Sequence, residues 1–85
     1  MKQVTFSIQA ARAAARKWRD ENSEHDAGVV LVWEGEAYGW KDRLRDPAHE
    51  RPGVYAVDPD GFVFVAQGGD DYSGAKCWVV VPSNT

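Results

Sequence analysis

The clearest structural signal in the sequence is residues 53–66, Gly53-Val54-Tyr55-Ala56-Val57-Asp58-Pro59-Asp60-Gly61-Phe62-Val63-Phe64-Val65-Ala66. Two runs of β-branched and aromatic residues flank Asp58-Pro59-Asp60-Gly61, which has the residue chemistry of a hairpin turn. Asp58 can accept a backbone hydrogen bond, and Pro59 has a φ suited to the second turn position. Gly61 can take the left-handed conformation that closes a type I turn with a bulge.

The register of this hairpin follows from placing Asp58 opposite Phe62. The predicted pairs are Val57 with Val63, Ala56 with Phe64, and Tyr55 with Val65. One face then carries Tyr55, Val57, Val63 and Val65, and the other carries Val54, Ala56, Phe62, Phe64 and Ala66. Both faces are apolar, which is unusual for an antiparallel sheet with one solvated side.

An amphipathic helix is predicted over residues 8–22, with Ser7 as its N-cap and a short strand at Val4-Thr5-Phe6 before it. The helical spacing places four apolar residues on one face: Ile8, Ala11, Ala15 and Trp18. A second stripe carries Arg12, Arg16 and Arg19. Small alanines on the apolar face allow a helix to lie close to a sheet.

Three further strands are predicted from apolar runs bounded by turn residues: residues 29–33, residues 37–40 and residues 76–81. Residues 41–52 are rich in charge and proline and predict a long surface connection with a helical turn near Leu44. The order of elements predicts one α+β domain over residues 1–85. It consists of one N-terminal amphipathic helix packed on a three- to four-stranded antiparallel sheet.

The second face of this sheet needs a cover, because one helix covers only one face. Three covers are open: the segment 40–52 folded back, a second copy of the chain as a homodimer, or a foreign protein partner. If a second copy or a foreign partner is the cover, the apolar surface of the second face is a binding surface.

Charge, cysteine content and hydrophobicity exclude several classes of protein. The 85 residues carry a net charge of −3, with a pI near 5.2, so the whole chain is not a general polyanion binder. A single cysteine allows no intrachain disulfide, no signal peptide opens the chain, and no apolar run reaches the ~18 residues of a membrane span. We therefore expect a cytoplasmic protein without a membrane partner.

No catalytic or cofactor motif occurs in the sequence. The spacing of His25, His49 and Cys77 matches no zinc pattern, and Gly68-Gly69-Asp70-Asp71 lacks the alternating oxygen ligands of a calcium loop. We expect no metal, no cofactor and no enzyme activity.

Two charged segments with aromatic residues are the predicted partner-binding sites. The residues are Trp40, Arg43, Arg45, Asp70, Asp71 and Tyr72. The tryptophan would be a surface anchor beside guanidinium groups, and the paired carboxylates could imitate nucleic-acid phosphates. The alternative is a small nucleic-acid-associated regulator or antitoxin-like subunit that contacts phosphate through Arg12, Arg16 and Arg19.

The layout resembles that of phage-encoded anti-CRISPR inhibitors: a short helix rich in Ala and Arg, then hairpin strands, in a small acidic chain. The segments that carry the resemblance are residues 10–18, 29–33, 54–66 and 76–81. It implies a non-enzymatic inhibitor in the bacterial cytoplasm. Such a protein would bind a large nucleoprotein effector, a CRISPR–Cas complex, and block target DNA recognition or nuclease recruitment.

Overall fold

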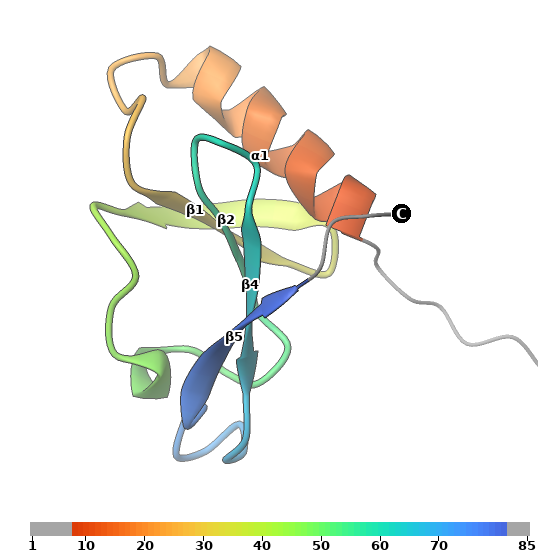
Figure 1. Ribbon diagram of the computed structural model, residues 1–85, viewed down its shortest axis with the longest axis vertical. Helices are drawn as coiled ribbons and strands as arrows, with labels where there is room; N and C mark the ends of the chain where they lie inside the picture. The colour runs from red at the N-terminus through yellow and green to blue at the C-terminus, as the bar shows by residue number, and fades with distance from the viewer. Residues whose placement is uncertain (1–7, 82–85) are drawn as a thin grey trace, which may run out of the picture.

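The computed structural model describes residues 8–81 and has one helix on a five-stranded antiparallel sheet (Figure 1). The elements are α1 Ile8–Glu21, β1 Val29–Trp33, β2 Glu36–Lys41, the 3₁₀ turn η1 Pro47–His49, β3 Tyr55–Val57, β4 Val63–Gln67 and β5 Cys77–Val81. The strand order is β2-β1-β3-β4-β5, with every neighbouring pair antiparallel. The predicted α+β class is confirmed. The strand at residues 4–6 and the cap at Ser7 lie outside the described residues.

The sheet has one strand more than the three or four predicted. Residues 36–41 form a full edge strand, although Glu, Gly and Lys are poor strand formers and gave only a weak local pattern. Pairing with β1 makes this segment a strand. The helical turn expected near Leu44 lies instead at η1, where Pro47 occupies the first turn and the Asp46 carboxylate accepts from the Ala48 N–H.

The central hairpin has the predicted register, Tyr55–Val65, Ala56–Phe64 and Val57–Val63. The Asp58 carboxylate accepts from the backbone N–H groups of Asp60 and Phe62, each at 2.9 Å. Gly61 has a φ of +90° and donates its N–H to the Asp58 carbonyl at 3.0 Å. The turn closes because Asp58 satisfies both orphan donors and glycine alone adopts this φ without strain.

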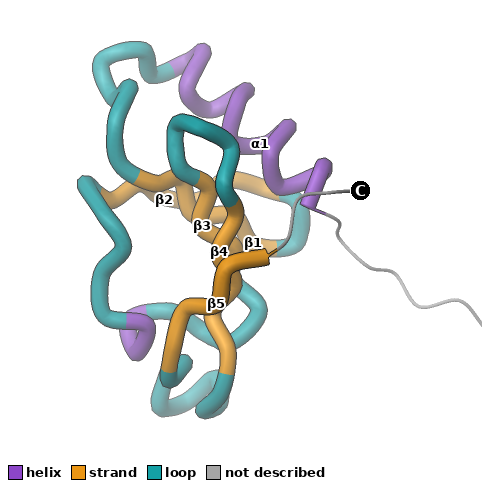
Figure 2. Tube along the Cα trace, viewed as in Figure 1, coloured by secondary structure: helices purple, strands orange, loops and turns teal. Residues whose placement is uncertain are grey.

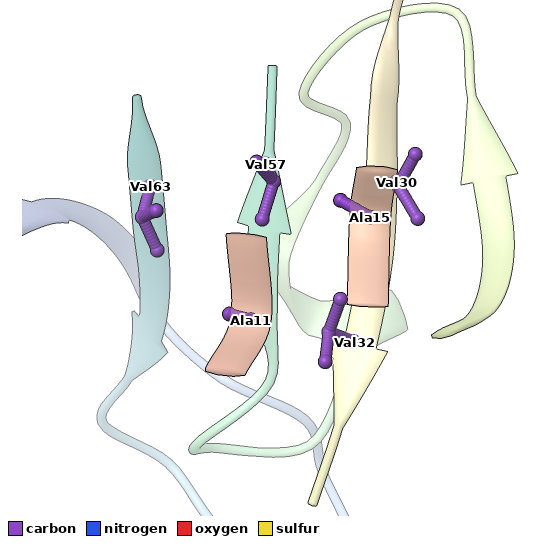
Figure 3. Packing of buried hydrophobic residues seen from close by; sticks show 6 residues of the cluster. All are labelled: Ala11, Ala15, Val30, Val32, Val57 and Val63. Atoms are coloured by element: carbon purple, nitrogen blue, oxygen red, sulfur yellow. The ribbon is translucent and has the colours of Figure 1, made fainter. Parts of the chain in front are cut away.

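The helix packs through the predicted face. Ala11 and Ala15 are 1% and 2% exposed, and Figure 3 shows them directed at the valines of the sheet. These valines are Val30, Val32, Val57 and Val63. Ile8 and Trp18 pack against the same cluster.

The opposite face is covered in part by the connection between β2 and β3, which Figure 2 shows as a loop interrupted by η1. The Trp78 indole donates to the Arg45 carbonyl at 2.8 Å, and the Ala75 N–H donates to the Glu50 carbonyl at 2.8 Å. Phe62 and Val80, however, remain 52% and 56% exposed. The chain's own segment 42–54 is therefore a cover for this face, and an incomplete one.

Candidate functional site

A cleft of about 820 Å³ lies on the sheet face away from α1. Three segments far apart in the sequence form its walls: residues 33–38 around the β1–β2 turn, residues 48–54 with η1, and the β4–β5 loop at residues 71–74. In Figure 1, η1 and the β4–β5 loop lie at the end of the molecule farthest from α1. We call it the acidic aromatic cleft, after its acids Glu34, Glu36, Glu50 and Asp71 and its rings Trp33, Tyr38 and Tyr72.

Glu50 is the fixed centre of one wall, because it is 8% exposed and both of its oxygens are bonded. The Tyr38 hydroxyl donates to Oε1 at 2.5 Å, and the Lys41 ammonium donates to Oε2 at 2.8 Å. Burial raises the pKa of the Tyr38 phenol well above its usual value, and the hydrogen bond to the Glu50 carboxylate raises it further. The cluster ties strand β2 to the segment after η1, and it holds Tyr38 against that wall.

Arg51 and Trp33 form a second wall. The Arg51 guanidinium carbon lies 4.7 Å from the Trp33 ring centroid, within the range of a cation–π contact. A guanidinium nitrogen of Arg51 lies 3.8 Å from an Asp71 oxygen. The wall therefore already holds one guanidinium between an aromatic face and a carboxylate.

Glu34 lies at the rim of the cleft in a strained backbone conformation. Its φ is +52°, it is followed by Gly35 at +84°, and the two link Trp33 directly to Glu36. Two consecutive residues with positive φ make a type I′ hairpin turn, where Asn and Gly are the favoured residues. A glutamate here costs about 1 kcal/mol relative to those residues. This strain places a carboxylate at the cleft rim.

The β4–β5 loop separates its acidic residues into two roles. The Asp70 carboxylate accepts from the Tyr72 and Ser73 N–H groups at 3.0 and 2.6 Å, so it closes the loop. Asp71 and Tyr72 line the cleft, and Tyr72 is 99% exposed. Of the six residues predicted to bind a partner, only these two lie in the cleft.

The other predicted site residues lie elsewhere. Trp40 packs against the helix-side core, its ring centroid lies 4.3 Å from that of His25, and its indole donates to the Ala27 carbonyl at 2.7 Å. Its ring fills the space between the helix end and the sheet, so it is not the free side chain that we expected, and its role in partner binding stays a prediction. Arg45 donates to Asp42 at 2.6 and 2.9 Å and lowers the pKa of that carboxyl, and Arg43 is exposed.

The arginine stripe of α1 serves the fold at two of its three positions. The Arg12 Nε donates to the Gly61 carbonyl at 2.7 Å. Arg19 donates to four carbonyls, those of His25, Ala27, Gly28 and Val57, at 3.0–3.2 Å. Burial lowers the pKa of Arg19, while Asp58 and Asp26 oppose the shift. Among residues 8–81, Arg16 alone of the three has no hydrogen bond or ion pair.

Sequence reasoning missed six charged or aromatic residues of the cleft: Trp33, Glu34, Glu36, Tyr38, Glu50 and Arg51. One local signal was present: Glu34-Gly35 is a two-residue link between strands with a glutamate where Asn is usual. Glu50 and Arg51 gave no signal, because their partners lie far away in the sequence.

Within residues 8–81, no group of three or more His, Cys, Asp and Glu side chains gathers to hold a metal ion. The same part of the chain has no helix long and apolar enough to span a membrane. Comparisons with protein-family models, curated proteins and solved structures find no match to this chain.

Proposed function

We propose that the protein is a non-enzymatic binding protein whose acidic aromatic cleft captures a basic segment of a protein partner. The single observation behind this is the composition of the cleft. Four carboxylates and three aromatic rings surround a hollow with Arg51 as its one permanent cation. Carboxylates attract Lys and Arg side chains, and aromatic faces bind the same cations.

The contact of Arg51 with Trp33 supports this choice of ligand. The geometry at 4.7 Å is the one that an incoming guanidinium would adopt on an exposed ring such as Tyr72. Tyr, Trp and Arg are also the residues that most often dominate protein interfaces. The strain at Glu34 gives further support, because a stable turn would carry Asn there.

Within this class we propose an inhibitor of a nucleoprotein effector, and in particular of a CRISPR–Cas complex. The resemblance in layout to anti-CRISPR inhibitors supports this partner. The channels of such effectors carry Lys and Arg to hold nucleic acid, so an acidic cleft is complementary to them. The protein would then block target DNA recognition or nuclease recruitment by occupying a basic surface.

Titration with an arginine-rich peptide tests the chemistry of the cleft. We expect saturable binding, followed by NMR shifts of Trp33, Tyr72 and their neighbours, that weakens with salt. The double variant Glu34→Asn with Asp71→Asn should lose about fivefold to tenfold in affinity, near ~1 kcal/mol for two exposed charge contacts. The control, Asp20→Asn with Asp60→Asn, removes the same charge at exposed positions outside the cleft and should bind as the wild type does.

Two outcomes would contradict the proposed cleft. One is equal binding by both double variants. The other is loss of binding only in Arg43→Glu with Arg45→Glu, which would assign the contact to the 42–46 segment and an acidic partner. The effector is tested separately: purified CRISPR–Cas complexes should lose target DNA binding or cleavage at equimolar inhibitor. Peptide binding without such inhibition would keep the cleft and reject the CRISPR–Cas partner.

A further inference from the structure

Strand β5 is an open edge of the sheet. It pairs with β4 on one side, and among residues 8–81 no further backbone hydrogen bond reaches residues 77–81. Its five residues, Cys-Trp-Val-Val-Val, include no charge, no proline and no glycine. Val79 is 37% exposed and Val80 is 56% exposed, on opposite faces of the strand. Figure 1 shows β5 at the front of the view, away from α1.

The backbone groups that point outward from this edge can be identified from the register. Phe62 accepts from Asp58, and Ala66 donates to Val54, so the even-numbered residues of β4 bond to the hairpin side. Alternation then directs Val63 and Val65 toward β5, where they pair with Val81 and Val79. The outward N–H and C=O groups of β5 are therefore those of Trp78 and Val80.

We propose that two copies of this chain pair through β5, antiparallel about a two-fold axis at Val79, to form a continuous ten-stranded sheet. Trp78 of each copy then exchanges two backbone hydrogen bonds with Val80 of the other copy, which satisfies all four outward groups of each strand. None of residues 77–81 lines the cleft, so this interface does not depend on the function proposed for the cleft.

The register is fixed at both ends. A shift toward the N-terminus would need the Lys76 N–H, which already donates to the Gln67 carbonyl at 2.8 Å. A shift toward the C-terminus would place Pro82, which has no N–H, opposite Trp78. The Val79 register therefore leaves no outward donor of residues 76–81 unpaired.

The self-complementarity of the strand favours a second copy over a foreign strand. In the two-fold antiparallel pair, Val79 lies opposite Val79 of the other copy, Trp78 lies opposite Val80, and Cys77 lies opposite Val81. Here every such meeting is between apolar residues, so no like charges face each other. The half-exposed side chain of Val80 lies next to the axis, opposite Trp78 of the other copy, and would lose exposed surface on pairing.

Cysteine cross-linking tests this geometry in the full chain. Residues at the axis form a pair without mutual hydrogen bonds, with Cα atoms about 4.5 Å apart, which suits a disulfide. With Cys77→Ser as background, Val79→Cys should convert mostly to a covalent dimer under mild oxidation. The matched control, Val80→Cys in the same background, lies beyond disulfide reach of its own copy, at more than about 7 Å, and should remain mostly single-chain.

Mass in solution gives the second readout. We expect the mass measured by light scattering to rise with protein concentration from 9.4 kDa, the mass of one chain, toward twice that value. Val80→Pro removes one outward N–H without touching the ladder to β4, so it should keep a single-chain mass. Val80→Thr retains the N–H and nearly the same shape, and it should dimerise as the wild type does.

Amide hydrogen exchange distinguishes pairing of β5 with a second copy from pairing with other residues of the same chain. The Trp78 and Val80 amides should gain protection as concentration rises, while those of Val79 and Val81 are protected throughout. Protection of Trp78 and Val80 at the lowest concentration, with a single-chain mass, would assign the edge to the chain's own residues and overturn the proposal. Equal cross-linking of the two cysteine variants, or a single-chain mass at millimolar concentration, would overturn it as well.

Discussion

The two edge strands of the sheet, β2 and β5, are protected to very different degrees. β2 has a bulge, because Val32 pairs with Ala37 and Leu31 pairs with Gly39, which leaves Tyr38 without a partner in β1. It also begins with Glu36 and ends with Lys41. Bulges and charges of this kind discourage pairing with another chain. β5 has neither.

The two faces of the sheet are also better covered near β2 than near β5. On the β2 side, α1 lies over one face and the Tyr38–Glu50–Lys41 cluster ties the edge strand to the segment that covers the other face. On the β5 side, Val79, Val80 and Phe62 remain between 37% and 56% exposed. The β2 edge is therefore protected by residues of the chain itself, while the β5 edge has exposed apolar surface available for association.

A glutamate placed under α1 and a glutamate placed on β5 should differ most in their effect on stability. Ala15→Glu, at a site 2% exposed against the sheet, should unfold the domain, because a buried unpaired carboxylate costs several kcal/mol. Val80→Glu, at a site 56% exposed in the single chain, should change the free energy of unfolding of the single chain by less than about 1 kcal/mol. Thermal melting followed by circular dichroism checks both. Equal damage from the two variants would mean that β5 is as enclosed as the helix side.

An intermediate effect is expected where α1 is tied to the start of β1, next to the end of β2. Arg19→Ala removes donors from four backbone carbonyls and should cost about 2 kcal/mol, as charged hydrogen bonds of a partly buried group do. Arg16→Ala, from the same stripe but exposed, should stay within ~0.5 kcal/mol. Urea unfolding measures the two values. If Arg19→Ala left the free energy of unfolding unchanged, these hydrogen bonds would add nothing to the stability of the protein.

The smallest effect concerns the pH dependence of the β2 edge. The folded-state pKa of Tyr38 lies above the ordinary value of 10.0, so the folded protein holds this proton more tightly than the unfolded chain does. The stability from this proton is fully present below pH ~10 and is lost as the pH rises further. Tyr38→Phe should therefore lose less stability than the wild type between pH 8 and pH 11.

The difference should be on the order of 1 kcal/mol or less, because the phenol is half exposed and water screens its interaction with Glu50. Urea unfolding at the two pH values provides the measurement, and other titrating groups contribute equally to both proteins. An identical decline in the two proteins would show that the Tyr38–Glu50 hydrogen bond does not persist in solution.

The parts of the fold that depend on neighbouring residues could be predicted from the sequence. Asp58-Pro59-Asp60-Gly61 has the chemistry of one turn type, and that turn sets the register of the central hairpin. The spacing of Ala11 and Ala15 sets the buried face of α1 for the same reason, since a helix places residues four apart on one side. These signals lie within a few residues, so they can be read without a structure.

The cleft, the packing of Trp40 and the protection of the two sheet edges could not be predicted, because they depend on contacts between residues distant in the sequence. The cleft joins residues 33–38, 48–54 and 71–74, and no local pattern records that Glu50 meets Tyr38 and Lys41. In the sequence, Trp40 stands beside charged residues, which is consistent with a surface anchor. In the structure, its ring packs against His25 and the helix-side core. A strand becomes an edge through the order in which the whole chain pairs, and that order follows from contacts between residues distant in the sequence.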